Sequence, residues 1–216
     1  MLSREEYLAA WSRWHGGVPT DRGLVRGWLT AVHTLAVPLA AVPPILATAL
    51  GLLLGFAAIV PAAAGGAWLV VAAVLVGLSG LLDSLDGALA IGTGRASRRG
   101  FVLDSAVDRL TEGAYAAALW LAGAPGLLAV AFGALCWLPD YLRARAGQAG
   151  VTETGALSVW ERPTRVILTG LTLGGAWVVS GLGWTAPVIV AGTIGGVVLG
   201  AVAVVQLGIG LRRLLG

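Results

Sequence analysis

The chain has 216 residues, of which 57% are hydrophobic and only 12% are charged, and its mean hydropathy is +0.87. Soluble domains carry about twice that share of charged residues, roughly a quarter. The only cysteine is Cys136, so no internal disulfide can form. Composition therefore excludes a soluble enzyme, a disordered chain and a disulfide scaffold.

Three long stretches without Asp, Glu, Lys or Arg indicate a polytopic membrane protein. They cover 27–82, 113–139 and 166–211, and each exceeds the ~20 residues that one helix needs to cross a bilayer. Turns rich in Gly and Pro punctuate these stretches near 61–66, 122–126 and 181–186. We place six membrane-spanning helices near 44–62, 67–90, 100–122, 125–146, 158–180 and 186–211.

The segment before the first span predicts helices that lie on the membrane surface. Residues 4–15 have the pattern of an amphipathic interfacial helix, with charges on the opposite face. The apolar face is formed by Tyr7, Leu8, Trp11 and Trp14. A second such segment runs from about residue 22 to residue 39. The predicted fold class is all-α, with an amphipathic juxtamembrane segment over 1–43 and a six-helix transmembrane domain over 44–216.

The placement of arginine predicts the orientation in the membrane. All 14 basic residues are arginine. Arg109 lies in the third predicted span, and the other 13 occur in the N-terminal segment, in the 91–99 and 143–165 loops and at the C-terminus. The three short turns carry no charge, so the positive-inside rule puts both termini in the cytoplasm of a plasma-membrane protein. The arginines form no long basic tract, and we expect no nucleic-acid partner.

Four aspartates flank the loop between the second and third predicted spans. Asp83 and Asp86 are three residues apart, and Asp104 and Asp108 are four apart, so each pair shares a helix face. The loop is short and cytoplasmic, which lets the pairs converge. Single acidic residues at span ends are often solvated caps, but four carboxylates near lipid repel one another unless cations neutralise them. Oxygen ligands favour Mg²⁺, Mn²⁺ or Ca²⁺, and two bridged ions would clamp phosphoryl oxygens.

These residues carry a resemblance to the CDP-alcohol phosphotransferase family, whose motif is D-x2-D-G-x2-A-R-x8-G-x3-D-x3-D. The one departure is Ile91, where the family has arginine. The resemblance covers nearly the whole chain and implies a six-span fold, a homodimer, and two Mg²⁺ or Mn²⁺ ions held by the four aspartates. Asp108 also resembles the general base that takes the acceptor hydroxyl proton. The motif positions that match are Asp83, Asp86, Gly87, Ala90, Gly100, Asp104 and Asp108.

The resemblance further implies which residues bind the nucleotide of a CDP-lipid. Residues 43–48 resemble the family's Pro-Asn-x-x-Thr entry to the first span, with Ile45 in place of the usual polar residue. Ser97 lies where family members contact the nucleotide with a hydroxyl, and the glycines of the motif allow close approach. The implied nucleotide-binding residues are Pro44, Ile45, Leu46, Thr48, Gly87, Ala90, Ile91, Ser97 and Gly100.

Two later segments, 140–146 and 161–165, resemble the phosphatidylinositol phosphate synthase branch and, more loosely, phosphatidylglycerol phosphate synthases. Gly147 and Leu207 depart from what the inositol branch has at those positions. Arginine suits a phosphate clamp because its fork binds two oxygens; the alternative is that these arginines anchor a cytoplasmic loop. The implied residues for the acceptor phosphate are Arg143, Arg145, Arg162 and Arg165.

Two nearby acidic residues have open roles. Asp140 could pair with Arg143, three residues further along a helix. Glu112 lies one turn beyond Asp108 and could either support the metal ligands or pair with Arg109. The sequence does not decide between these.

The predicted function is metal-dependent transfer of a phosphatidyl group from a CDP-lipid, such as CDP-diacylglycerol, to a polar, phosphorylated alcohol, with release of CMP, in phospholipid biosynthesis. One alternative is a cation- or proton-coupled transporter that uses membrane carboxylates, although all four aspartates gather at one membrane face. Another is a family member that is inactive or has a different donor, because Ile91 and Ile45 remove polar contacts to the nucleotide.

Overall fold

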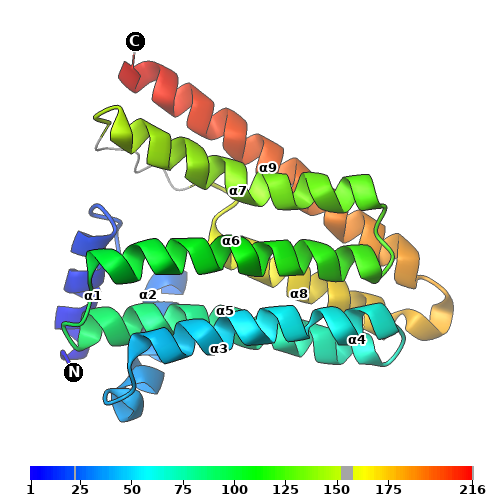
Figure 1. The fold of residues 1–216 in the computed structure, drawn as a ribbon, viewed down its shortest axis with the longest axis horizontal. Coiled ribbons are helices and arrows are strands. Elements are labelled where there is room, and N and C mark those ends of the chain that lie inside the picture. Colours follow the sequence, from blue (N-terminus) through cyan, green and yellow to red (C-terminus); the bar gives the residue numbers. More distant parts are fainter. Residues whose placement is uncertain (22, 152–157, 216) are drawn as a thin grey trace. The chain divides into compact units, whose positions relative to one another are not determined.

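The regular structure of the chain is helical. The computed structural model describes residues 1–21, 23–151 and 158–215, and within these residues it contains helices and no strands, so the all-α prediction is confirmed. Short 3-10 turns occur at Val37–Leu39 and Ser180–Leu182. The helices, in chain order, are α1 (Arg4–Trp14), α2 (Gly23–Ala36), α3 (Pro44–Ala57), α4 (Ile59–Ala64), α5 (Trp68–Gly92), α6 (Arg98–Leu121), α7 (Gly126–Gln148), α8 (Arg162–Val178) and α9 (Thr185–Leu215) (Figure 1).

Within the part of the chain that the structure describes, four helical segments are long and apolar enough to cross a membrane: Pro44–Ala64, Trp68–Gly92, Gly126–Gln148 and Thr185–Leu214. The chain is therefore an integral membrane protein. Helices α6 and α8 are not among these segments. The first half of α6 carries several charged residues, and α8, with 17 residues, is shorter than the ~20 that one crossing needs. The six-span topology stays a prediction.

Proline and glycine explain how the first predicted span ends. The span divides at Ala58 into α3 and α4, shortly before Pro61. A proline inside a helix has no N–H to donate and its ring clashes with the carbonyl four residues earlier, which here belongs to Ala57, the last residue of α3. Helix α4 then ends before Gly65 and Gly66, which take φ values of +66° and +51° that favour glycine.

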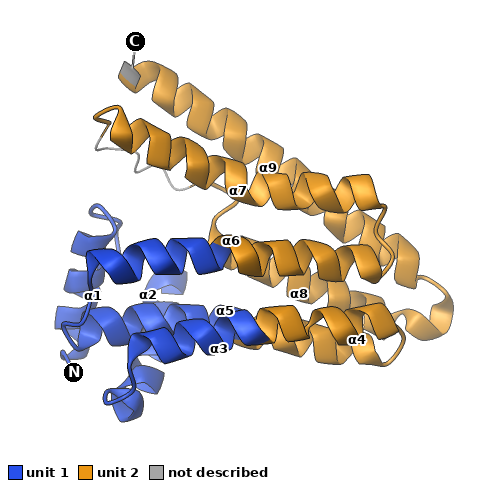
Figure 2. Cartoon of the chain, viewed as in Figure 1, with its two compact units in different colours: residues 1–53, 79–108 blue, residues 54–78, 109–216 orange. Residues whose placement is uncertain are grey.

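The described residues form two compact units (Figure 2). Unit 1 contains residues 1–53 and 79–108, and unit 2 contains residues 54–78 and 109–216. The division passes through α3, α5 and α6. It does not test the predicted boundary after residue 43.

Helix α1 packs into the apolar core of unit 1. Tyr7 and Leu8 are buried at 1% and 2% exposure, and Trp11 packs partly against the same core. Trp14, predicted on the same face, is instead 48% exposed. The start of α1 is held near the end of α5, because the backbone N–H of Leu2 donates to the carbonyl of Gly92 over 2.7 Å. Arg22, in the second predicted amphipathic segment, lies outside the described residues.

Unit 2 contains a close contact between α9 and its neighbours that depends on glycine. Helix α9 packs along α7 and α8 (Figure 1), and three of its glycines, four residues apart, form what we call the glycine row. A Cβ atom at Gly192 would stand 2.1 Å from Thr172 Oγ1, and one at Gly196 would stand 2.3 Å from Phe132 Cε2. The third member, Gly200, faces Leu135 in the same way. Small residues of this kind permit close helix approach in membranes.

Candidate active site: an aspartate cluster and an arginine network

Three of the four predicted metal ligands come together in unit 1. Asp83 lies on α5, and Asp104 and Asp108 lie one turn apart on α6. Each is half-buried, and one carboxylate oxygen from each lies within 4.8 Å of those of the other two. We call these three residues the aspartate cluster. The four-residue spacing on α6 places its two carboxylates on one face, as the sequence predicted.

Asp86 is held differently from the other three aspartates. It is buried at 6% exposure, and its Oδ2 accepts a hydrogen bond of 2.6 Å from the hydroxyl of Thr48 on α3. The same hydroxyl contacts the carbonyl of Pro44 over 3.2 Å. Thr48 was predicted to bind the nucleotide, and in the structure its hydroxyl orients the carboxylate of Asp86.

The aspartate cluster fits a divalent metal in its chemistry. Its donors are all carboxylate oxygens, the type that Mg²⁺ and Mn²⁺ prefer. Carboxylates this close repel one another when ionised, and a bound cation removes that repulsion. The cluster is thus a site able to hold a metal ion; its identity, the number of ions and the place of Asp86 among the ligands stay predictions.

The remaining motif residues lie around the end of α5 and the start of α6. Nothing lies within 4 Å of where a Cβ of Gly87 would stand, so space is open beside it. Ser97 caps α6: its Oγ accepts the backbone N–H of Gly100 over 3.0 Å. Ala90 is half-buried, and Ile91 is buried at 9% exposure in the core of unit 1.

The predicted nucleotide residues at the start of α3 are apolar and exposed. Ile45 and Leu46 are 47% and 57% exposed, so neither offers a polar contact. Arg95, in the loop after α5, donates to the hydroxyl of Thr93 and to the carbonyl of Ala40. The guanidinium of Arg95 is therefore held by its own neighbours within unit 1.

The predicted phosphate-binding arginines of unit 2 are paired with carboxylates. Arg165 is 1% exposed, and its Nη1 bonds to Glu112, which is fully buried, and to Asp140 over 2.9 Å. Its Nε donates to the carbonyl of Trp160 over 3.0 Å. These contacts hold α8 to α6 and α7. Glu112 thus pairs with arginine, one of the two roles that the sequence left open.

The pairing continues through two further arginines. Arg109 lies 3.1 Å from Glu112 Oε2 and also bonds to Asp140. Arg143 bonds to Asp140 over 3.2 Å and to Glu161 through both terminal nitrogens. We call these six residues, with Arg162, the arginine network. Ser158 also donates to Glu161, from its backbone N–H over 2.7 Å and from its hydroxyl over 2.8 Å.

The other two predicted acceptor residues differ in exposure. Arg162 has a side chain 15% exposed and lies 3.9 Å from Glu112, whereas Arg145 is exposed and donates to Gln148 over 2.7 Å. Sequence reasoning assigned no role to Glu161, and it weighed Arg109 only as a partner of Glu112. The three-residue spacing from Arg109 to Glu112 was a signal for one contact, but the contacts to α7 and α8 join residues far apart in the chain.

Comparisons with known proteins identify the family. A family model described as CDP-alcohol phosphatidyltransferase matches residues 40–207, which include every residue of the aspartate cluster and of the arginine network. The chain belongs to the CDP-alcohol phosphatidyltransferase family. The resemblance drawn from the motif is therefore confirmed.

Relatives of this CDP-alcohol phosphatidyltransferase family member are synthases of inositol lipids. An archaetidylinositol phosphate synthase of Aeropyrum pernix is 40% identical over 110 residues, covering 49% of this chain and 56% of the relative. A phosphatidylinositol phosphate synthase of Corynebacterium glutamicum is 37% identical over 115 residues, covering 49% of this chain and 51% of the relative. The chain spans about half the length of these curated relatives.

A solved structure extends the similarity over most of the chain. The crystal structure of a Mycobacterium tuberculosis phosphatidylinositol phosphate synthase with CDP-DAG bound is 27% identical, with a TM-score of 0.62. The match covers 84% of this chain and 92% of that chain. The family fold is thus shared beyond the motif.

Proposed function

We propose that this protein transfers a phosphatidyl group from a CDP-lipid, of the CDP-diacylglycerol type, to a phosphorylated polar alcohol and releases CMP. The observation that carries the proposal is the aspartate cluster. Its three carboxylates have oxygens within 4.8 Å of one another, and all three residues belong to the motif of the CDP-alcohol phosphatidyltransferase family. The solved relative with CDP-DAG bound supports the choice of donor.

The four aspartates would bind the metal ions, and one of them would accept the proton of the acceptor. Asp83, Asp104 and Asp108, together with Asp86 held by Thr48, would hold two Mg²⁺ or Mn²⁺ ions. Such ions, when bound, neutralise charge on the diphosphate oxygens and on the departing CMP. The hydroxyl oxygen of the acceptor attacks the phosphorus next to the lipid, and the bond from that phosphorus to CMP breaks. The carboxylate of Asp108 accepts the proton that the hydroxyl loses.

The acceptor that fits best is an inositol phosphate. Both curated relatives make inositol phosphate lipids, and unit 2 offers arginines at the predicted positions. In the arginine network four arginines face three carboxylates, Glu112, Asp140 and Glu161, which leaves an excess of positive charge for a phosphate. Arg145 is exposed and bonds to an amide, so its guanidinium would make the first contact with the phosphate.

The membrane arrangement is part of the proposal. Helix α6 has 24 residues and at 1.5 Å per residue is about 36 Å long, and α8 with 17 residues is about 26 Å long. Both suffice for a bilayer core of about 30 Å with modest tilt or thinning, giving six spans. The arginine distribution puts both termini and the aspartates on the cytoplasmic side of the plasma membrane, and a homodimer follows from the family resemblance.

The test is a reconstituted transfer assay. The full chain in lipid nanodiscs is given CDP-diacylglycerol, Mn²⁺ and one of several alcohols: inositol phosphate, glycerol phosphate or unphosphorylated inositol. We expect CMP release and a new lipid of matching mass with inositol phosphate. Chelation of the metal should abolish release and added Mn²⁺ should restore it. Absence of CMP with every alcohol would overturn the proposal.

A matched pair of variants on α6 controls the assay. Asp104→Asn removes a charge of the aspartate cluster and should abolish CMP release. Ser105→Ala changes the next residue, whose hydroxyl is exposed and donates to the carbonyl of Phe101 one turn earlier, and should leave release unchanged. If the two variants behave alike, the cluster does not carry the reaction.

A further inference from the structure

Ile91, which stands where the family motif has arginine, lines a hollow on unit 1. The hollow has a volume of about 310 Å³ and lies between α1 and the end of α5. It is lined by Ala10, Arg13, Trp14, Ile91 and Ala96, and we call it the α1–α5 hollow. Ala10, Arg13 and Trp14 are three and four residues apart, so they share one face of α1.

The hollow continues a row of motif positions along α5. Asp83, Gly87 and Ile91 are four residues apart in succession, so they lie one above another on the helix. Eight residues at 1.5 Å each separate the aspartate from Ile91 by about 12 Å along the axis. The middle position, Gly87, has open space beside it. A ligand whose diphosphate lies at the aspartate cluster could therefore run past Gly87 and end in the hollow.

The side chains of the hollow suit the nucleoside end of such a ligand. Trp14 is 48% exposed and offers an indole face, on which nucleobases stack. Arg13 is exposed, so its guanidinium is open to the oxygens of a nucleotide bound in the hollow. Arg95 is instead bonded to Thr93 and Ala40.

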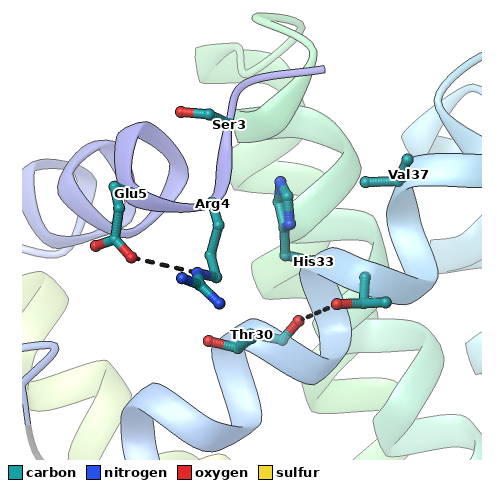
Figure 3. A pocket seen from close by; sticks show the side chains of 7 residues that line it. Ser3, Arg4, Glu5, Thr30, His33 and Val37 are labelled. Carbon is teal, nitrogen blue, oxygen red and sulfur yellow. Dashed lines mark hydrogen bonds and ion pairs between the residues drawn. The ribbon is translucent and has the colours of Figure 1, made fainter.

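A second hollow of unit 1 lacks this chemistry. It has a volume of about 530 Å³ and lies between α1 and α2, lined by Ser3, Arg4, Glu5, Thr30, His33, Thr34 and Val37 (Figure 3). Its cation, Arg4, bonds to Glu5 over 3.2 Å, and the lining includes no tryptophan. Arg4 therefore provides a control arginine on the same helix as Arg13.

We propose that the α1–α5 hollow binds the cytidine end of the CDP-lipid, with Trp14 against the base and Arg13 supplying the positive charge that Ile91 removes from the motif. This inference rests on the proposed function and deepens it. Helix α1 would then form part of the donor site, in addition to its predicted place on the membrane surface. The soluble nucleotide should then bind without any lipid.

The experiment measures the affinity of the full chain in detergent for CDP and for CDP-diacylglycerol in the presence of Mn²⁺. We expect Trp14→Ala and Arg13→Gln each to weaken CDP binding about tenfold. Trp14→Phe, which keeps an aromatic face, and the control Arg4→Gln should bind CDP like the wild type. Monodisperse elution from size-exclusion chromatography checks that each variant is folded.

A double variant tests the substitution of charge directly. If Arg13 replaces the motif arginine, adding Ile91→Arg to Arg13→Gln should recover most of the lost CDP affinity. No change in CDP affinity for Trp14→Ala and Arg13→Gln would overturn the inference while leaving the proposed function intact. Weaker binding of CDP-diacylglycerol with unchanged binding of CDP would also overturn it, because α1 would then act only as a membrane anchor. A wild type that neither binds CDP nor releases CMP would remove the proposed function itself.

Discussion

Replacing Glu112 by glutamine tests whether the arginine network is primarily a structural device. Glu112 is fully buried and Arg165 is 1% exposed, and the two bond directly. Breaking a buried ion pair by removing one partner costs about 3–5 kcal/mol, because the other charge stays buried without compensation. Arg165 would keep Asp140 at 2.9 Å, so we expect the lower end, about 3 kcal/mol.

The matched control is Glu161→Gln. Its partner Arg143 and Glu161 itself have side chains that are 20% and 26% exposed, so water screens the pair and the loss should be about 1 kcal/mol. In a chain of this length 1 kcal/mol shifts the unfolding temperature by roughly 2–4 °C. The expected shifts are therefore about 6–12 °C for Glu112→Gln and about 2–4 °C for Glu161→Gln.

Thermal unfolding in detergent, followed by tryptophan fluorescence, measures both shifts, and steady-state kinetics measures the KM for the acceptor. Equal shifts for the two variants would refute the reasoning, since burial would then not set the cost. A raised KM for the acceptor in Arg165→Lys, with an unfolding temperature like that of the wild type, would show that Arg165 binds phosphate and does not mainly hold the helices together.

Three further predictions concern the reaction and the packing. Asp108→Asn should abolish CMP release yet retain part of the Mn²⁺ binding, because an amide offers an oxygen but takes no proton; isothermal titration with Mn²⁺ and a CMP assay separate the two, and normal CMP release would exclude Asp108 as the base. Thr48→Val removes a hydrogen bond to a buried carboxylate and should lower kcat/KM for the donor roughly tenfold, whereas an unchanged value would contradict that role. Gly196→Ala should lower stability by about 1–3 kcal/mol through the clash with Phe132, while the neighbouring Gly195→Ala, with open space around it, should not; equal melting temperatures would contradict the packing argument.

Local spacing made the aspartate cluster predictable. Asp104 and Asp108 share a helix face by periodicity alone, and the short loop between α5 and α6 brings them back beside Asp83 in unit 1. The same reasoning placed Asp86 with the others, but it could not show that a threonine 38 residues earlier bonds to its carboxylate. The break at Ala58 between α3 and α4 could also have been predicted, from the position of Pro61. The predicted span of 44–62 instead continued through the break.

Long-range pairing made the arginines unpredictable. Arg165 and Glu112 are 53 residues apart, and their contact depends on how α8 packs against α6. A basic residue in a cytoplasmic loop looks the same in sequence whether it is paired or available to a ligand. Trp14 gives a parallel case on α1, because periodicity placed it on one apolar face with Tyr7 and Leu8 but could not show that these two are buried while Trp14 stays exposed beside the α1–α5 hollow.

The glycine row also limits which changes of length α9 can tolerate. One residue inserted between Gly192 and Gly200 would rotate everything after it by about 100° around the helix axis. Side chains larger than hydrogen would then face Leu135 and Trp160, which lie close to Gly200. Insertions after Gly200, toward Arg212 and Arg213, would leave the row in register. Among homologous chains, α9 should therefore vary in length at its C-terminal end and stay constant between these glycines.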